Sequence, residues 1–242
     1  MDAGGPKRKL TRKRYPCRKI QCQCSKECKL PPIPNSESPF CQRHQNCANS
    51  SPLSGSEPDY QPDQWNTLAD IKQSHNCFSY AFNVWDSKKR EKCKNNSDCS
   101  FHQPGFAAGY PAFSDKKFKT CSDMMLRLKG DNNIIKKTTF SKKPSKGFSK
   151  IAMIVDPNAD FHFLRQDSNG YWSHKPGATN VINKDSDGRL IFNPELANFC
   201  YPDKKEPLHY WNFCAYYEIP RNRPVFVRGG RKTRKTRKTP KE

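Results

Sequence analysis

The sequence predicts an α+β domain, a helix packed on an antiparallel sheet, with a small Cys-rich N-terminal segment and disordered basic tails. Hydrophobic residues make up only 33% of the 242 residues, and there are 20 prolines. A compact part of roughly 150 residues is therefore expected, instead of a core that spans the whole chain. Helical and strand periodicities occur in the middle of the chain, whereas positive charge is concentrated at both ends.

The two basic tails are residues 1–16 and 221–242. Residues 1–20 hold eight Lys/Arg and one acid, and residues 221–242 hold ten Lys/Arg and one acid, in a chain of net charge +21. We expect such runs to stay extended and to bind nucleic acid or another polyanion non-specifically, because the repeat RKTRKTRKT has no aromatic side chain to stack on bases. A purely solubilising tail is the alternative. The candidate contacts are Arg231, Lys232, Arg234, Lys235, Arg237 and Lys238.

The chain has no stretch of about 20 apolar residues that would predict a membrane span. No apolar stretch follows the basic N-terminus, which argues against a secretory signal. The sequence thus predicts a reducing cell interior. In that compartment, the 12 cysteines are expected to be thiols or metal ligands, not a disulfide framework.

Residues 17–47 predict a structural zinc site. Six of the 12 cysteines lie here, and the segment has too few apolar residues to fold without a metal. Zinc prefers four Cys or His ligands in two close pairs. One such set, with spacing x3, x12 and x2, is Cys24, Cys28, Cys41 and His44. Three further cysteines leave the ligand set open, and an unstructured Cys-rich segment is the alternative. The ending FCQRH is similar to small zinc motifs of phage and large-virus proteins.

Residues 48–64 are rich in Ser, Pro, Gly and Asp and predict a linker, so the main domain is expected at residues 65–220. Within it, Asn76 is a good N-cap for a helix that begins at Cys77. Its apolar face would be formed by Phe78, Ala81, Phe82 and Trp85. Residues 121–129 predict a second, amphipathic helix with Met124, Met125 and Leu128 on its core side.

Three successive strands are predicted within residues 150–177, and a last strand near residues 210–217. Residues 151–155 are apolar on both faces and predict a central strand. Asn169-Gly170 predicts a hairpin that joins the strand carrying His162 to the strand carrying His174. A two-residue loop would put the two histidines on opposite faces, whereas a three-residue Ser-Asn-Gly loop with a bulge would put them on one face. The sequence leaves both loops open.

A thiol at a helix N-terminus is a candidate nucleophile. The helix dipole and free backbone N–H groups favour a thiolate at Cys77 and can hold an oxyanion, with Gln73 as a second donor. A strand histidine such as His162 would serve as the base, oriented by His174, or else by Asn180 or Asp185. The alternatives are a small buried cysteine and two structural histidines. His75 and His102 are expected at the surface.

The motifs NCFSYAFN, HQPG and FHFLRQDSNGYWSHKPG resemble those of an uncharacterised set of large-DNA-virus and phage proteins with NCYxYA, QPG and WSHKPG motifs. The order of cysteine and histidine is similar to that of NlpC-type papain-like cysteine hydrolases, whose triads often run Cys, His, His. The resemblance covers roughly residues 70–218. It implies a papain-like fold, with Cys77, His162 and His174 as the catalytic residues.

Two functions follow as expectations. The first is a papain-like cysteine hydrolase of a peptide, isopeptide or amide bond, from a large DNA virus, that is associated with the virion or with DNA. The second is a catalytically inactive virion structural or nucleic-acid-associated protein that works through its tails and zinc segment. Either protein would be located in the virion or in the host cell interior, not secreted and without a membrane span.

Overall fold

The computed structural model describes residues 17, 21–45, 47, 49–113, 119–202 and 207–221. The predicted tail at 1–16, and the tail residues from 222 onward with Arg231 to Lys238, lie outside the described residues. The longest helix among the described residues has 11 residues. In this part of the chain, no helix has the length and apolar character that a membrane crossing requires.

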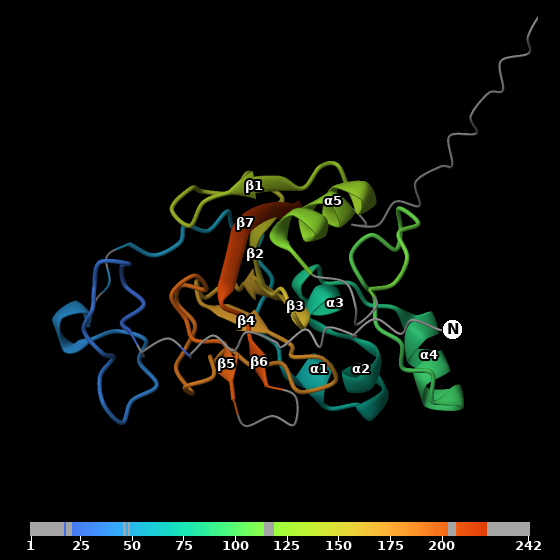
Figure 1. Cartoon of the computed structure of the whole chain (residues 1–242), viewed down its shortest axis with the longest axis horizontal. Coiled ribbons are helices and arrows are strands. Elements are labelled where there is room, and N and C mark those ends of the chain that lie inside the picture. Colours follow the sequence, from blue (N-terminus) through green and yellow to red (C-terminus); the bar gives the residue numbers. More distant parts are fainter. Residues whose placement is uncertain are drawn as a thin grey trace, which may run out of the picture.

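A five-stranded antiparallel sheet forms the centre of the domain, with the strand order β1-β7-β2-β3-β4 (Figure 1). Its strands are β1 Lys136–Thr138, β2 Phe148–Asp156, β3 Asp160–Gln166, β4 Trp172–His174 and β7 Asn212–Pro220. A separate two-stranded sheet pairs β5 Cys200–Tyr201 with β6 Leu208–His209. The predicted central strand at 151–155 is confirmed, since β2 lies in the middle and is buried along almost its whole length.

The β3–β4 hairpin uses the longer of the two predicted loops. Asp167 N donates to Tyr171 O at 2.9 Å, which leaves Ser168, Asn169 and Gly170 as the loop. Gly170 has a φ of +86°, a left-handed conformation that glycine adopts without strain. In this register Leu164 lies opposite His174. His162 and His174 therefore share one face of the sheet.

The helices are short and lie mainly before the sheet in the sequence. They are α1 Asp63–Asn66, α2 Ala69–Ser74, α3 Cys77–Ala81, α4 Ser87–Asn96, α5 Cys121–Asp131 and the 3-10 helix η1 Gln42–His44. The predicted cap of α3 is confirmed, because the Asn76 side chain accepts from Ser79 N at 3.2 Å. The helix is shorter than predicted: Asn83 has a φ of +55°, and Trp85 is 47% exposed and thus not part of a buried face.

The two faces of the sheet carry different cores. On one face, α3 and α5 pack against β2, β3 and β7, and the buried Met124 and Leu128 confirm the predicted core side of α5. On the other face, a second cluster joins Ile154 and Leu164 to Trp172 and to the segment that follows β4. The chain thus has the mixed α+β organisation, with helices on an antiparallel sheet, that the sequence predicts.

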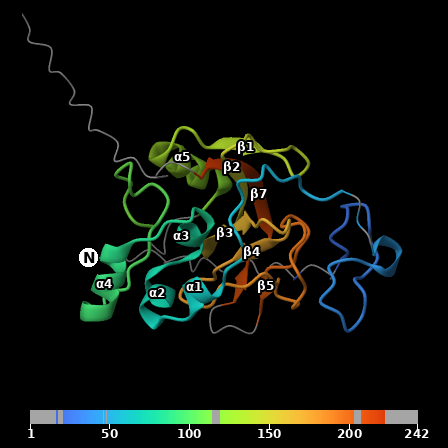
Figure 2. The same cartoon turned by 180° about the vertical axis from the view of Figure 1, so that it is seen from behind.

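The predicted linker packs on the sheet domain. Ser51 is buried and accepts from Lys150 Nζ at 2.6 Å, and Asp59 O accepts from Arg165 Nη2 at 3.0 Å. The Cys-rich segment lies at the opposite end of the molecule from α4, as both views show (Figure 1 and Figure 2).

Eight of the 12 cysteines form disulfides, so the expectation of free thiols and metal ligands is wrong for these eight. The pairs are Cys17–Cys200, Cys24–Cys47, Cys93–Cys99 and Cys121–Cys214. Their Cα atoms lie between 4.4 and 5.6 Å apart, which is the reach of a disulfide. Two of the pairs are 183 and 93 residues apart in sequence, and only the tertiary structure brings them together.

Candidate functional site

Four side chains of the Cys-rich segment form a candidate metal centre. The possible ligand atoms of Cys22, Cys28, Cys41 and His44 all lie within 4.8 Å of one another. Cys28 Sγ is 3.6 Å from Cys41 Sγ, and His44 Nδ1 is 3.2 Å from Cys41 Sγ and 3.8 Å from Cys22 Sγ. A tetrahedral zinc ion bound at its usual bond lengths would set ligand atoms roughly 3.5–3.8 Å apart. The three distances are close to this spacing.

Local backbone structure places the ligands. The 3-10 turn η1 carries His44 back over Cys41, with His44 N donating to Cys41 O at 2.9 Å. Cys41 N points at Cys22 Sγ at 3.1 Å, a backbone donor that would stabilise a metal-bound thiolate. Burial raises the pKa of the Cys22 thiol to about 11. A metal must therefore displace this proton, and its affinity falls as the pH is lowered.

The predicted ligand set is corrected at one position. Cys28, Cys41 and His44 are brought together as predicted, but Cys24 forms a disulfide with Cys47 and Cys22 takes its place. A bend at Gln23 and Cys24 sends the two cysteines to different partners. The only sequence signal was the presence of spare cysteines, because the x3 spacing of Cys24 to Cys28 is more typical of a zinc pair than the x5 spacing of Cys22.

The Cys-rich segment is attached to the sheet domain through the loop before β5. The Gln23 side chain accepts from Phe192 N and Asn193 N at 2.9 and 3.1 Å. The Arg189 guanidinium donates to the backbone oxygens of residues 33, 36 and 38. Asp185, predicted as a possible orienting residue, contacts Gln23 instead, at 3.3 Å, and burial raises its pKa to about 6. It therefore helps to hold the two parts of the chain together.

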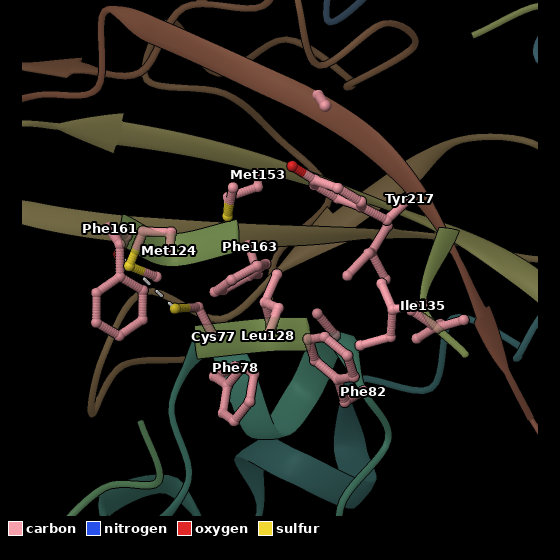
Figure 3. Close-up of a cluster of buried hydrophobic side chains, with 14 of the residues drawn as sticks. Cys77, Phe78, Phe82, Met124, Leu128, Ile135, Met153, Phe161, Phe163 and Tyr217 are labelled. Atoms are coloured by element: carbon pink, nitrogen blue, oxygen red, sulfur yellow. Dashed lines mark hydrogen bonds between the residues drawn. The ribbon is translucent and has the colours of Figure 1, made fainter. Parts of the chain in front are cut away.

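The predicted nucleophile lies in the hydrophobic core. Cys77 is only 4% exposed and belongs to the cluster formed by α3, α5 and the sheet, beside Met124 and Phe161 (Figure 3). Its sulfur lies 4.0 Å from the Phe161 carbonyl oxygen. Burial, and then the charge of Asp160, raises the pKa of the thiol to about 12. The helix N-terminus does not offset this desolvation, so the buried position of Cys77 does not favour the predicted thiolate.

The predicted base lies on the opposite side of the sheet from the thiol. Phe161 and Phe163 of β3 point into the Cys77 cluster, and successive strand residues point to opposite faces. His162 therefore faces away from Cys77, and the predicted pair of nucleophile and base is not formed. The hairpin does bring the two histidines together as required, with His162 Nε2 2.7 Å from His174 Nδ1.

The histidine pair forms a buried structural network. His174 Nε2 lies 2.9 Å from Lys184 O, and a carbonyl oxygen can only accept, so this nitrogen carries the hydrogen. In neutral His174, Nδ1 then accepts from His162 Nε2. The His162 ring also packs on Tyr210, with centroids 5.2 Å apart. The pair links β3 and β4 to the following loop.

The other predicted groups also lie elsewhere. Gln73 is exposed, and its side-chain oxygen lies 3.8 Å from Cys99 in the Cys93–Cys99 disulfide, so it does not face Cys77 as an oxyanion donor. Asn180 is exposed. His75, expected at the surface, is fully buried.

Comparisons with known proteins give one informative similarity. A curated protein from Ruditapes philippinarum, "Insoluble matrix shell protein 1", is 32% identical to this chain over 143 residues, which cover 57% of the chain and 80% of that protein. No protein-family profile matches the chain, and no solved structure matches it. The viral resemblance inferred from the motifs stays a prediction.

Proposed function

Since this chain belongs to the family of insoluble matrix shell protein 1 of Ruditapes philippinarum, we propose that it is a non-catalytic structural protein of an insoluble extracellular matrix. This proposal keeps the structural role that the sequence offered as its second function, and moves it from a virion to an extracellular matrix.

The disulfide framework is the observation that carries the proposal. Four disulfides in one domain are typical of proteins that mature in an oxidising compartment, because thiols stay reduced in the cytosol and nucleus. The Cys17–Cys200 pair ties the Cys-rich segment to β5, and the Cys121–Cys214 pair ties α5 to β7. Such covalent links hold a domain folded outside the cell. This location differs from the cell interior that the sequence predicted.

Zinc is the ion that we propose for the Cys22, Cys28, Cys41 and His44 centre. Three thiolates and one imidazole are a common ligand set of structural zinc, and four protein ligands leave no open position for catalysis. The segment around the centre contributes few apolar residues to its own core. The metal would therefore hold this segment in its fold.

The basic ends suit attachment to acidic polymers of a matrix. Most of the net charge of +21 lies in the first 20 and last 22 residues, and polyanions bind such runs by releasing their counterions. Charge neutralisation between a cationic protein and an acidic polymer lowers the solubility of both. Nucleic acid would be bound by the same chemistry if the protein met it.

We favour this role over the papain-like hydrolase predicted from the motifs. The packing of α3 on β3 is the feature that supports a papain-like arrangement, and that arrangement stays a prediction. The chemistry does not favour catalysis, because the thiol of Cys77 is buried with a raised pKa and His162 faces the other side of the sheet.

Fractionation of the source organism would test the proposal. Mineral and soluble material would be removed with a chelator, and the residue probed with an antibody against the domain. We expect the chain in the insoluble residue, with four intact disulfides by peptide mass spectrometry without reduction. Recovery in the cytosolic or nuclear fraction with reduced cysteines would contradict the proposal.

A further inference from the structure

A surface hollow lies between the Cys-rich segment and the β3–β4 turn. Its volume is about 640 Å³, within the range of small-molecule sites. One wall comes from the Cys-rich segment, with Phe40 and Gln45, and the opposite wall from Asn169 and Tyr171. Phe192 and the stretch at residues 50–53 complete the hollow. Neither the predicted catalytic residues nor the metal-ligand set line it.

The lining is uncharged although the chain is strongly cationic. Among the described residues that line the hollow, none is Lys, Arg, His, Asp or Glu, in a chain of net charge +21. Its apolar part combines Cys47, Pro52 and Leu53 with three rings. Phe40 and Phe192 are buried and pack edge to face at 4.8 Å, and the half-buried Tyr171 approaches Phe192 at 6.2 Å. Its exposed polar part is formed by the Gln45 and Asn169 amides and the Ser50 hydroxyl, whereas the Ser51 side chain is buried at the back of the lining.

Asn169 in the lining and Ser51 behind it are held in place by hydrogen bonds. The Asn169 side-chain oxygen accepts from Tyr171 N at 3.0 Å, which orients the amide on the tight turn. Behind the hollow, Ser51 Oγ accepts from Lys150 Nζ at 2.6 Å and donates to Gln166 at 3.2 Å. Lys150 is fully buried and also donates to Phe140 O, so its ammonium group is covered by protein acceptors.

This lining selects a class of ligand. An anion would lack a cationic partner at the surface of the hollow, and a cation would lack a carboxylate. A sugar ring is uncharged. The C–H groups on its faces can pack against the electron-rich face of an aromatic ring such as Tyr171, and the hydroxyls at its edge can pair with the Gln45 and Asn169 amides and the Ser50 hydroxyl. We propose that the hollow binds a neutral sugar unit of a polysaccharide. This inference is independent of the basic ends, which would bind acidic polymers.

Ligand-observed NMR on the full-length, oxidised chain would test the inference. The probes would be neutral tetrasaccharides of N-acetylglucosamine, β-1,4-glucose and α-1,4-glucose, with a heparin tetrasaccharide for comparison. We expect at least one neutral probe to bind with a Kd on the order of 1 mM or below. Tyr171→Ala should weaken the affinity for that neutral probe about tenfold. Tyr171→Phe, which keeps the ring, should bind the probe nearly as well as the parent.

Tyr110→Ala is the matched control, since Tyr110 is an exposed aromatic residue on the loop before α5, outside the hollow. It should bind the neutral probe as the parent does. The inference is overturned if only the heparin probe binds, or if Tyr171→Ala, folded by circular dichroism, binds a neutral probe as tightly as the parent.

Discussion

Removing the disulfide between Cys121 and Cys214 should destabilise the domain strongly. The bond joins the first residue of α5 to β7 across 93 residues. In the chain-entropy account, a loop of this length adds about 4–5 kcal/mol to the free energy of unfolding, whereas the 6-residue separation of Cys93 and Cys99 adds only about 2 kcal/mol. The double variant Cys121→Ser/Cys214→Ser should therefore lose about twice as much stability as Cys93→Ser/Cys99→Ser.

Urea unfolding followed by tryptophan fluorescence would measure this difference. Trp65 and Trp172 are both buried and will report the loss of the fold. Saturating zinc should be present throughout, so that the metal centre is the same in all variants. The reasoning would be refuted if the two double variants lost equal stability with unchanged urea dependence, or if Cys121 and Cys214 proved to be free thiols in the native protein.

Further predictions concern the metal, the thiol, a buried lysine and the basic tail. Cys22→Ser should lower bound zinc well below one equivalent by elemental analysis, whereas Cys24→Ser/Cys47→Ser should retain it; full retention in Cys22→Ser would show that the ligand set is wrong. Iodoacetamide should not label Cys77 in the folded chain at mildly acidic pH, and the labelling rate should be the same in His162→Ala. Rapid labelling that depends on His162 would support the predicted cysteine hydrolase. Burial lowers the pKa of Lys175 to about 7 in the folded state. Above that pH, Lys175 therefore binds more protons in the unfolded state than in the folded state. The contribution of Lys175 to the free energy of unfolding should therefore rise from about pH 7 to pH 10. The free energy of unfolding in urea should depend less on pH in Lys175→Met than in the parent; an identical pH dependence would argue against a lowered pKa of Lys175. Deleting residues 222–242 should reduce the salt dependence of heparin binding, and an unchanged slope would remove this tail from the binding account.

The sequence alone predicted the features that depend on neighbouring residues. The Asn76 cap, the core side of α5 and the apolar central strand follow from short-range rules, and the structure confirms them. Three of the four metal-centre residues were also predicted, since Cys41 and His44 are one turn apart and Cys28 is a short loop away. The Asn-Gly turn was recognised as well, although its loop length stayed open.

Only the tertiary structure decided which face of the sheet each strand side chain occupies and which distant cysteines pair. A shift of one residue along β3 would put His162 beside Cys77 in place of Phe163, and nothing in the local sequence determines how the strand is placed against α3. The choice between Cys22 and Cys24 depended on a bend and on the distant Cys47. The cysteines 93 and 183 residues apart meet in the folded chain because tertiary packing, not sequence spacing, sets those distances.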